Sequence, residues 1–255
     1  MTFEQPAIIF CATQRRGSTM IVDDFQNATG RVGTETEAFY HLAIKRGIQD
    51  WPKALEIVQY HRQGEAIFFD KFMFPFLPIL SNMMASEGVP NSTDCFAKFF
   101  ASAIWVYIRR ANIFEQTVSK YTAETLGIWD AATAIDDFNA AMNFDVNLAR
   151  KYMRGLIKED ARWLGFFKRH DIKPIQIFYE DAVPNFPNYL RPVLSAAGLQ
   201  IDFDNLNQRR RNKLGNARSA VLAQFLENVV QRDLIAQMFK DRAAQGPVGP
   251  NHMPD

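Results

Sequence analysis

Several features that reveal the class of a protein are scarce in this 255-residue sequence. It contains only 2 cysteines, Cys11 and Cys95, which are too few for a disulfide framework or a cysteine-based zinc cluster. No apolar stretch approaches the length that spans a membrane. Neither sign of charge dominates, because 29 Lys and Arg residues are balanced by 28 Asp and Glu residues. The chain therefore has no global field that attracts nucleic acid or an anionic membrane, and any anion site must be local.

The start of the sequence lacks the pattern of a secretory leader. An apolar run begins at Ala7, and no charged segment followed by a separate apolar stretch precedes it. We therefore expect a cytoplasmic protein with two free thiols, no nucleic-acid partner and no stable membrane insertion. Residues 243–255 are rich in Gly and Pro and show no periodicity. We expect a single α/β domain over residues 1–242, followed by a flexible tail.

Strand-like and helix-like segments alternate along the chain. Runs rich in Ile, Val, Phe or Tyr predict strands at Ala7–Ala12, Ala66–Phe69, Ile104–Ile108 and Pro174–Phe178. Helical spacing predicts helices at Ser18–Ala28, Pro52–Gln63, Phe76–Ser86, Ile113–Leu126, Asp136–Arg169, Tyr189–Ala197 and Ala217–Phe239. The alternation predicts an α/β fold with a P-loop-like, mainly parallel sheet flanked by helices. The ligand site of such a sheet lies beyond the carboxyl ends of its strands.

The turn between the first expected strand and helix is a candidate anion site. A strand-to-helix turn leaves the first helical N–H groups without partners, and they point at whatever occupies the turn. A small residue, two arginines and two hydroxyl groups suit an anion there. The turn and helix start carry, in order, Gln14, Arg15, Arg16, Gly17, Ser18 and Thr19. The alternative is a capped helix start with two solvated arginines.

This loop departs from the motif of the nucleotide triphosphatases. Their motif has a Lys between the last Gly and a Ser or Thr, whereas here Arg16 precedes Gly17 and Ser18 follows it directly. A transferred phosphoryl group normally needs magnesium to offset its charge. A sulfuryl group carries less charge, so Lys, Arg and helix-end donors can handle it without a metal. The loop therefore favours sulfuryl transfer over an ATP-dependent kinase, and we expect no metal.

A second element supports this interpretation. The segment Trp105–Ser119 is a strand that ends in Arg110, followed by a helix that carries Ser119. Together the two elements resemble the PAPS-dependent sulfotransferases, whose donor is adenosine 3′-phosphate 5′-phosphosulfate (PAPS). The first loop is similar to the motif A-S-Q-R-S-G-S-T of the trehalose 2-sulfotransferase group of bacterial carbohydrate sulfotransferases. The resemblance implies that residues 14–19 bind the 5′-phosphosulfate and that Arg110 and Ser119 hold the 3′-phosphate.

The resemblance also implies a catalytic base in the segment Gly33–Phe39. Alignment on its glycine and aromatic residue assigns this role to Glu37, with Glu35 as second candidate; two solvated loop carboxylates are the alternative. Other sulfotransferases use a histidine, which makes His41 a third candidate, although a lone His is more often structural. Lys71 is expected at the end of the second strand, where it contacts sulfuryl or phosphate oxygens or extends to solvent.

Three further expectations concern arginines and a departure from the family pattern. The basic cluster of Arg209, Arg210, Arg211 and Lys213 is implied to close over the donor, or else forms a solvated face. Arg109 is the weaker phosphate candidate, because adjacent residues of a strand point in opposite directions. Glu115 replaces a Ser that is frequent in the family, and we expect it to point away from the phosphate because like charges repel.

The resulting hypothesis is a PAPS-dependent sulfotransferase that modifies a hydroxyl group of a carbohydrate or glycolipid. Adenosine 3′,5′-bisphosphate is then the product of the donor. The resemblance also implies a homodimer. Two alternatives remain, namely a P-loop nucleotide-dependent kinase and a non-catalytic nucleotide-binding protein. The sequence leaves open which sugar is the acceptor, because the base segment differs from the trehalose pattern at Thr34, Thr36 and Ala38.

Overall fold

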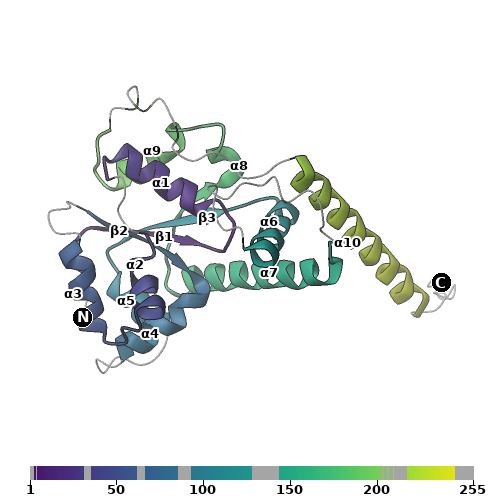
Figure 1. Cartoon of the computed structure of the whole chain (residues 1–255), viewed down its shortest axis with the longest axis horizontal. Coiled ribbons are helices and arrows are strands. Elements are labelled where there is room, and N and C mark those ends of the chain that lie inside the picture. The colour runs from purple at the N-terminus through teal and green to yellow at the C-terminus, as the bar shows by residue number, and fades with distance from the viewer. Residues whose placement is uncertain are drawn as a thin grey trace, which may run out of the picture.

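A parallel sheet organises the chain (Figure 1). The computed structural model describes residues 3, 5–31, 36–61, 67–85, 93–127, 144–201, 203, 206, 209 and 217–244. In this part of the chain, four strands pair in the order β2-β1-β3-β4, and each pair is parallel. The strands are β1 Ala7–Ala12, β2 Phe68–Met73, β3 Ile104–Arg109 and β4 Ile175–Phe178. The α/β fold expected from the alternating pattern is confirmed.

The first two strands along the chain are buried along their whole length. Every residue of β1 and β2 is buried, as expected for parallel strands covered on both faces. Cys11 of β1 lies in register with Phe72 of β2 and Tyr107 of β3, so these strands end at the same edge. The second strand was expected at Ala66–Phe69. Ala66 lies outside the described residues. The predicted end is wrong, because the strand continues through two buried charged residues to Met73, and Lys71 lies inside it.

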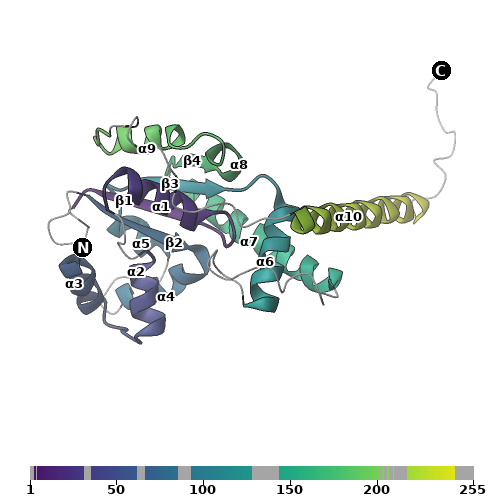
Figure 2. The same cartoon turned by 45° about the horizontal axis from the view of Figure 1, so that its top comes forward.

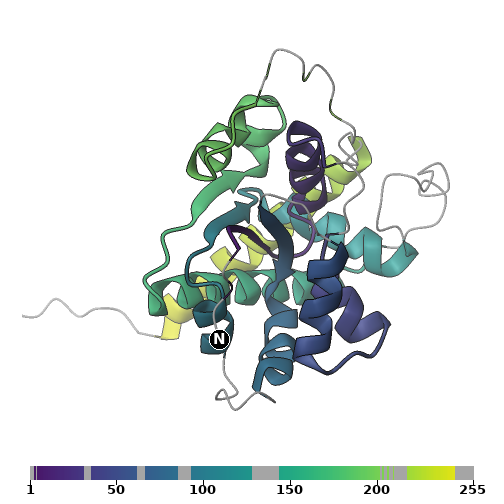
Figure 3. The ribbon, with the colours of Figure 1, turned by 90° about the vertical axis from the view of Figure 1, so that its left-hand side faces the viewer.

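Helices cover both faces of the sheet (Figures 1 and 2). One face packs against α1, α8 and α9, and the other against α2, α3, α4, α5 and the end of α7. Figure 3 shows the same layers from one end of the sheet. The helices of these layers are α1 Ser18–Ala28, α2 Ala38–Tyr40, α3 Trp51–His61, α4 Leu77–Ala85, α5 Thr93–Phe99, α7 Val146–Arg169, α8 Tyr179–Ala182 and α9 Arg191–Ala196.

Short irregular turns continue some of these helices. A π-helix, η1 His41–Lys45, extends α2, and a 3₁₀ helix, η2 Phe74–Phe76, joins β2 to α4. Another 3₁₀ helix, η4 Asn188–Leu190, precedes α9. The last described residue of β1, Ala12, accepts a hydrogen bond of 2.9 Å from the buried indole of Trp163 on α7. This hydrogen bond connects α7 to the end of β1, where the first loop begins.

A third group of helices lies beside the carboxyl edge of the sheet. Tyr121 of α6 Ile113–Leu126, Ala149 of α7 and Leu226 of α10 Ala217–Ala244 form a small cluster of their own. The far end of α10 projects from the body in Figures 1 and 2. It runs through Ala244, so the segment expected as a tail begins within a helix, and residues 245–255 lie outside the described part. None of the described helices combines the length and apolar character needed to cross a bilayer.

Candidate functional site

The loop after β1 is a tight turn between strand and helix. Gly17 precedes α1 with φ 74°, and its carbonyl accepts from the N–H of Ile21 at 3.0 Å. A Cβ at this position would lie 2.2 Å from Cδ2 of Tyr179, so only glycine fits under that ring. Arg15 also has a positive φ of 63°. The turn therefore brings its backbone against α8 and directs neighbouring side chains to different sides.

Arg15, Arg110 and Ser119 converge on one side of the loop. Arg15 Nε donates to Ser119 Oγ at 3.0 Å, and Arg110 Nη1 donates to the carbonyl of Arg15 at 3.2 Å. The Arg110 guanidinium also lies over the ring of Tyr179, 4.8 Å from its centroid. Burial and the charge of Arg110 both lower the pKa of Arg15. An anion placed between the two guanidinium groups would relieve this repulsion.

Glu115 is also part of this side of the site. Its Oε2 accepts from Arg110 Nη2 at 2.6 Å, and Glu180 Oε1 lies 4.0 Å from Arg110 Nε. The expectation that Glu115 points away is therefore wrong. The prediction considered repulsion from a bound phosphate, whereas the partly buried Arg110 attracts the nearest carboxylate. Glu115 also lies in the first turn of α6, where the helix dipole favours an acidic side chain.

Arg16 turns into the protein interior, although it is adjacent to Arg15. It is 3% exposed and donates to the hydroxyl of Tyr107 at 3.1 Å and to the carbonyl of Ile108 at 3.2 Å. It also forms an ion pair with Asp160 of α7, which accepts a hydrogen bond from Tyr107 as well. Burial raises the pKa of Tyr107, so its hydroxyl stays a neutral donor. Arg16 thus fastens the loop to α7 and β3 and lies apart from the Arg15 and Arg110 pair.

Glu37 and Lys71 meet on the other side of the loop. Lys71 Nζ donates to the hydroxyl of Thr19 at 3.1 Å and lies 3.8 Å from Glu37 Oε2. The side chain of Lys71 is 4% exposed and that of Glu37 20%. The residues expected to provide a base, a cation and a hydroxyl donor therefore come together, from α2, β2 and α1. A solvated Lys71 is excluded by its burial.

Asp70 positions this group, and sequence reasoning gave it no role. Its Oδ1 accepts from the backbone N–H groups of Glu37 at 2.6 Å, Ala38 at 3.2 Å and Lys71 at 2.9 Å. Asp70 is fully buried and fixes the start of α2, where Glu37 adopts a left-handed φ of 64°. The available signal was a charged pair, Asp70-Lys71, within a run of aromatic and apolar residues. A buried carboxylate needs several donors, and here two of them belong to the candidate base segment.

The other base candidates differ in their placement. The backbone N–H of His41 donates to the carbonyl of Glu37 at 3.0 Å, so His41 lies one turn further along the same helical segment. Its ring packs beside Tyr40, with centroids 5.7 Å apart. Glu35 lies outside the described residues.

Tyr40 also stacks on Phe76 of η2, with ring centroids 4.0 Å apart. The two rings form an aromatic surface next to the Glu37 segment.

Comparisons with known proteins identify the class of this molecule. The sequence model of the Stf0 sulphotransferase family matches residues 54–224. The chain belongs to this sulfotransferase family. The matched part includes Lys71, Arg110 and Ser119, whereas the first loop and Glu37 precede it. No curated protein matches the chain at a significant level.

Two solved structures resemble the fold of this sulfotransferase. One is the sulfotransferase domain from the olefin synthase of Synechococcus PCC 7002, with a TM-score of 0.51 and 16% identity. It covers 89% of this chain, and this chain covers 89% of it. The other is the sulfotransferase domain from the curacin biosynthetic pathway, with a TM-score of 0.51 and 12% identity over 86% of this chain and 83% of that chain. These structures support the same α/β architecture.

Helix α6 connects the sulfotransferase loop to the family-matched part. Gln116 donates to the hydroxyl of Thr13 at 3.0 Å and to the carbonyl of Gln14 at 2.7 Å. Lys120 forms a hydrogen bond with the side-chain oxygen of Gln14. Gln14 thus contacts α6, and the structure adds Gln116 and Lys120 to the residues around the loop. Both were missed, because their helical spacing alone suggested an ordinary packed helix.

Arg209 of the basic cluster has a different role from the one expected. Its Nε donates to Asp24 of α1 at 2.9 Å, and its Nη1 and Nη2 donate to the carbonyls of Val183 and Ala182 at 2.9 and 2.8 Å. The guanidinium therefore connects α1 to the end of α8, and its hydrogen bonds go to groups of the protein itself. Its neighbours Arg210 and Arg211 lie outside the described residues.

Arg109 was the weaker phosphate candidate. Its guanidinium lies 3.8 Å from Asp160 and donates to Gln176 at 3.2 Å, on another side of β3 from Arg110.

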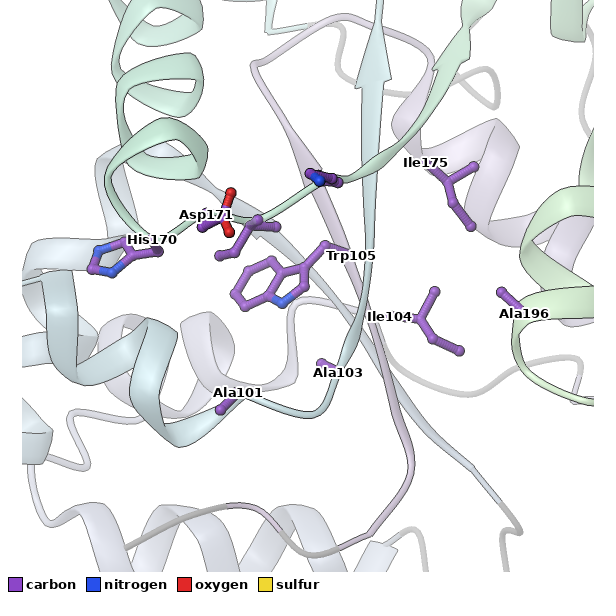
Figure 4. A pocket seen from close by; sticks show the side chains of 10 residues that line it. Ala101, Ala103, Ile104, Trp105, His170, Asp171, Ile175 and Ala196 are labelled. Carbon is purple, nitrogen blue, oxygen red and sulfur yellow. The ribbon is translucent and has the colours of Figure 1, made fainter.

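A cavity of about 380 Å³ lies at the opposite edge of the sheet (Figure 4). Ile104 and Trp105 begin β3 and Ile175 begins β4, so the cavity opens at the amino ends of these strands. His170 and Asp171 form another part of its wall. Catalytic candidates gather at the carboxyl ends instead. The cavity therefore lies apart from the sulfotransferase site.

Proposed function

We propose that this sulfotransferase moves a sulfuryl group from PAPS to a hydroxyl group of a carbohydrate or glycolipid. The observation that carries the proposal is the contact chain from Glu37 through Lys71 to Thr19. A carboxylate that can accept a proton lies next to a buried cation, and that cation reaches the start of α1. In-line transfer needs the carboxylate on the side of the sulfur atom where the acceptor hydroxyl attacks. It needs the cation and the start of α1 on the side where the phosphate leaves.

The residues on the β3 side fit a nucleotide that carries a 3′-phosphate. Arg110 Nε is buried and has no hydrogen-bond partner in the described part of the chain. The neighbouring Arg15 is destabilised as a cation by burial and by Arg110. A phosphate with several acceptor oxygens would accept from Arg110 Nε and offset the charge of both guanidinium groups. We therefore assign Arg110, Arg15 and Ser119 to the 3′-phosphate, and the backbone N–H groups of the turn with the hydroxyl groups of Ser18 and Thr19 to the 5′-phosphosulfate.

Each catalytic group has a separate task in this proposal. The bound donor supplies a sulfuryl group whose bond to the bridging phosphate oxygen breaks, with the electron pair left on the phosphate. Glu37 accepts the proton of the acceptor hydroxyl as its oxygen bonds to sulfur. Lys71, the Thr19 hydroxyl and the first N–H groups of α1 offset the charge that develops on the leaving phosphate. Asp70 holds Glu37 in position through the backbone.

The aromatic surface of Tyr40 and Phe76 supports a sugar as the acceptor. A sugar ring has apolar faces of C–H groups and a rim of hydroxyl groups. Tyr40 offers both an aromatic face and a hydroxyl, and it lies in the short helix that begins directly after the candidate base. Its half-buried ring stacks on Phe76 of η2, the short helix that follows the strand that carries Lys71. An acceptor hydroxyl held there would lie on the Glu37 side of the site.

A ligand panel tests this proposal. Thermal unfolding is measured with PAPS, with adenosine 3′,5′-bisphosphate, and with ATP in the presence and absence of magnesium. We expect stabilisation by the first two without metal and much weaker stabilisation by ATP with magnesium. Transfer from PAPS is then assayed on a panel of sugars and glycolipids. Preference for ATP with magnesium would indicate a kinase, and donor binding without transfer to any acceptor would indicate a non-catalytic nucleotide-binding protein.

Location and assembly are further parts of the proposal. We propose that the enzyme works in the cytoplasm, which is supported by Cys11 and Cys95 being buried free thiols. A homodimer stays a prediction, and light scattering of the purified chain tests it. A measured mass equal to that of a single chain at working concentration would contradict the homodimer.

A further inference from the structure

The group around Arg110 contains as many carboxylates as guanidinium groups. Arg110 contacts Glu115 at 2.6 Å and Glu180 at 4.0 Å, and Arg15 adds the second cation. The formal charges of these four side chains cancel. A phosphate monoester carries more negative charge than a carboxylate, and it binds best where cations are free to pair with it. Binding of a 3′-phosphate must therefore change at least one of these ion pairs.

Glu180 is firmly held by the backbone. Its two carboxylate oxygens accept from the N–H groups of Ala111 at 3.0 Å and Asn112 at 3.1 Å, which fixes the connection between β3 and α6. Moving Glu180 would leave both of these donors without their acceptor. The carboxylate of Glu180 is therefore a fixed part of the pocket, and it is the less favourable one to displace.

Within the part of the chain that the structure describes, the Glu115 carboxylate has one hydrogen-bond partner. Its carboxylate accepts from Arg110 Nη2, while its backbone N–H is capped separately by Asn112 Oδ1 at 3.0 Å. The side chain is 31% exposed, and a Glu side chain has several rotatable bonds. It can turn toward solvent while α6 stays in place. Glu115 is thus the group that an incoming anion would displace from Arg110.

Resting on the function proposed above, we propose that Glu115 determines how strongly the enzyme selects a 3′-phosphorylated donor. Its carboxylate competes with the 3′-phosphate for Arg110. A nucleotide with a free 3′-hydroxyl leaves the Arg110 and Glu115 pair intact, whereas a 3′-phosphate must break it. The enzyme therefore distinguishes the two nucleotides less sharply than a variant with a neutral residue at this position.

Calorimetric titration of two nucleotides tests this proposal. Adenosine 3′,5′-bisphosphate and adenosine 5′-monophosphate are titrated without metal into the natural chain and into Glu115→Gln. We expect the variant to bind the bisphosphate about tenfold more tightly, equal to about 1.4 kcal/mol, with the monophosphate changed by less than about twofold. Glu56→Gln is the matched control, because it removes the same charge from an exposed position on α3. It should leave both affinities unchanged.

A double variant separates direct competition from a general charge effect. In the Arg110→Ala background, adding Glu115→Gln should no longer improve binding of the bisphosphate, because the shared partner is absent. A gain that persists there overturns the proposal, as does an equal gain for the monophosphate or unchanged binding of the bisphosphate in Glu115→Gln. If the bisphosphate binds and needs Arg110 but ignores Glu115, only this inference fails. If it binds to none of the variants, the proposed donor site fails as well.

Discussion

The two sides of the loop after β1 are held together in different ways. On the β2 side, Glu37 and Lys71 are fixed through their backbone N–H groups, which donate to the buried carboxylate of Asp70. On the β3 side, Arg15, Arg110 and Glu115 are long side chains that contact one another. A change of rotamer breaks the contacts of the second group, whereas the backbone hydrogen bonds that anchor the first group do not depend on rotamers. The β2 side is built to keep a fixed geometry, and the β3 side to exchange one partner for another.

This difference suits the separate demands of chemistry and binding. Proton transfer and charge stabilisation require groups that are in place before the reaction begins. Binding and release of a charged nucleotide benefit from internal ion pairs that replace the ligand when it leaves. Variants on the β2 side should therefore change turnover, and variants on the β3 side should change affinity.

Replacement of the candidate base should have the largest effect. Glu37→Gln keeps the size of the side chain but cannot accept a proton, so turnover should fall by roughly 10²–10⁴-fold. Affinity for adenosine 3′,5′-bisphosphate should barely change. The measurements are steady-state transfer to an identified acceptor and calorimetry of the bisphosphate.

Two parallel variants check the assignment of the base. His41→Asn and Glu35→Gln should keep most of the turnover. If Glu37→Gln stays active while His41→Asn or Glu35→Gln loses activity, the base is the residue whose replacement abolishes turnover. If all three stay active, the catalytic carboxylate lies outside this segment, and the expected contrast between the two sides is lost.

Arg16 should matter for stability and Arg15 for binding. Arg16→Met leaves Asp160 without its buried cation, so the free energy of unfolding should fall by about 2–4 kcal/mol, less than for a fully buried pair because Asp160 is 22% exposed. Urea unfolding measures this loss. Arg15→Met should unfold near the natural midpoint and bind adenosine 3′,5′-bisphosphate more weakly. The reverse pattern would show that the two neighbours have been assigned to the wrong sides.

Loss of Arg110 should weaken one nucleotide selectively. Arg110→Ala removes a charge-assisted contact of about 1.5–3 kcal/mol, so affinity for adenosine 3′,5′-bisphosphate should drop roughly ten- to hundredfold. Adenosine 5′-monophosphate should bind almost as before. Calorimetry of both ligands decides the matter, and an equal loss for both would remove Arg110 from the 3′-phosphate pocket.

The smallest effect is expected at the start of α1. Thr19→Val removes the hydroxyl that accepts from Lys71, a single hydrogen bond worth about 0.5–1.5 kcal/mol, so turnover should fall roughly two- to tenfold. Thr29→Val is the control, because its hydroxyl bonds the carbonyl of Phe25 just after the same helix ends. Equal losses in turnover from both variants would indicate a general effect on α1 and not a contact of Lys71.

Local patterns predicted much of the fold. The bounds of β1, α1 and α6 agree with the expected Ala7–Ala12, Ser18–Ala28 and Ile113–Leu126, because each segment has a clear period and a turn residue or cap at its start. The second strand was misplaced, since Asp70 and Lys71 interrupt its apolar pattern. Their burial depends on partners from distant segments, and no local pattern reveals such partners.

The candidate site was predicted as a set of residues more than as a geometry. The sequence motifs identified four candidate residues, namely Glu37, Lys71, Arg110 and Ser119. The structure shows that Glu37 lies next to Lys71. The opposite directions of Arg15 and Arg16 could not be foreseen, because they depend on a positive φ at Arg15 and on Asp160, which is distant in the sequence. The turn of Glu115 toward Arg110 follows from an electrostatic balance that only the assembled site defines.

The hydrogen bond from Trp163 to the carbonyl of Ala12 gives the protein an internal optical reporter. Its indole is buried directly before the loop and stacks on Phe167, with ring centroids 5.5 Å apart. Tryptophan emission responds to changes in hydrogen bonding and local field. A ligand that tightens or shifts the loop would alter this carbonyl and with it the emission of Trp163. We therefore expect occupancy of the site to change the tryptophan emission of the chain, in which Trp163 is one of 4 tryptophans, without a label and without knowledge of the acceptor.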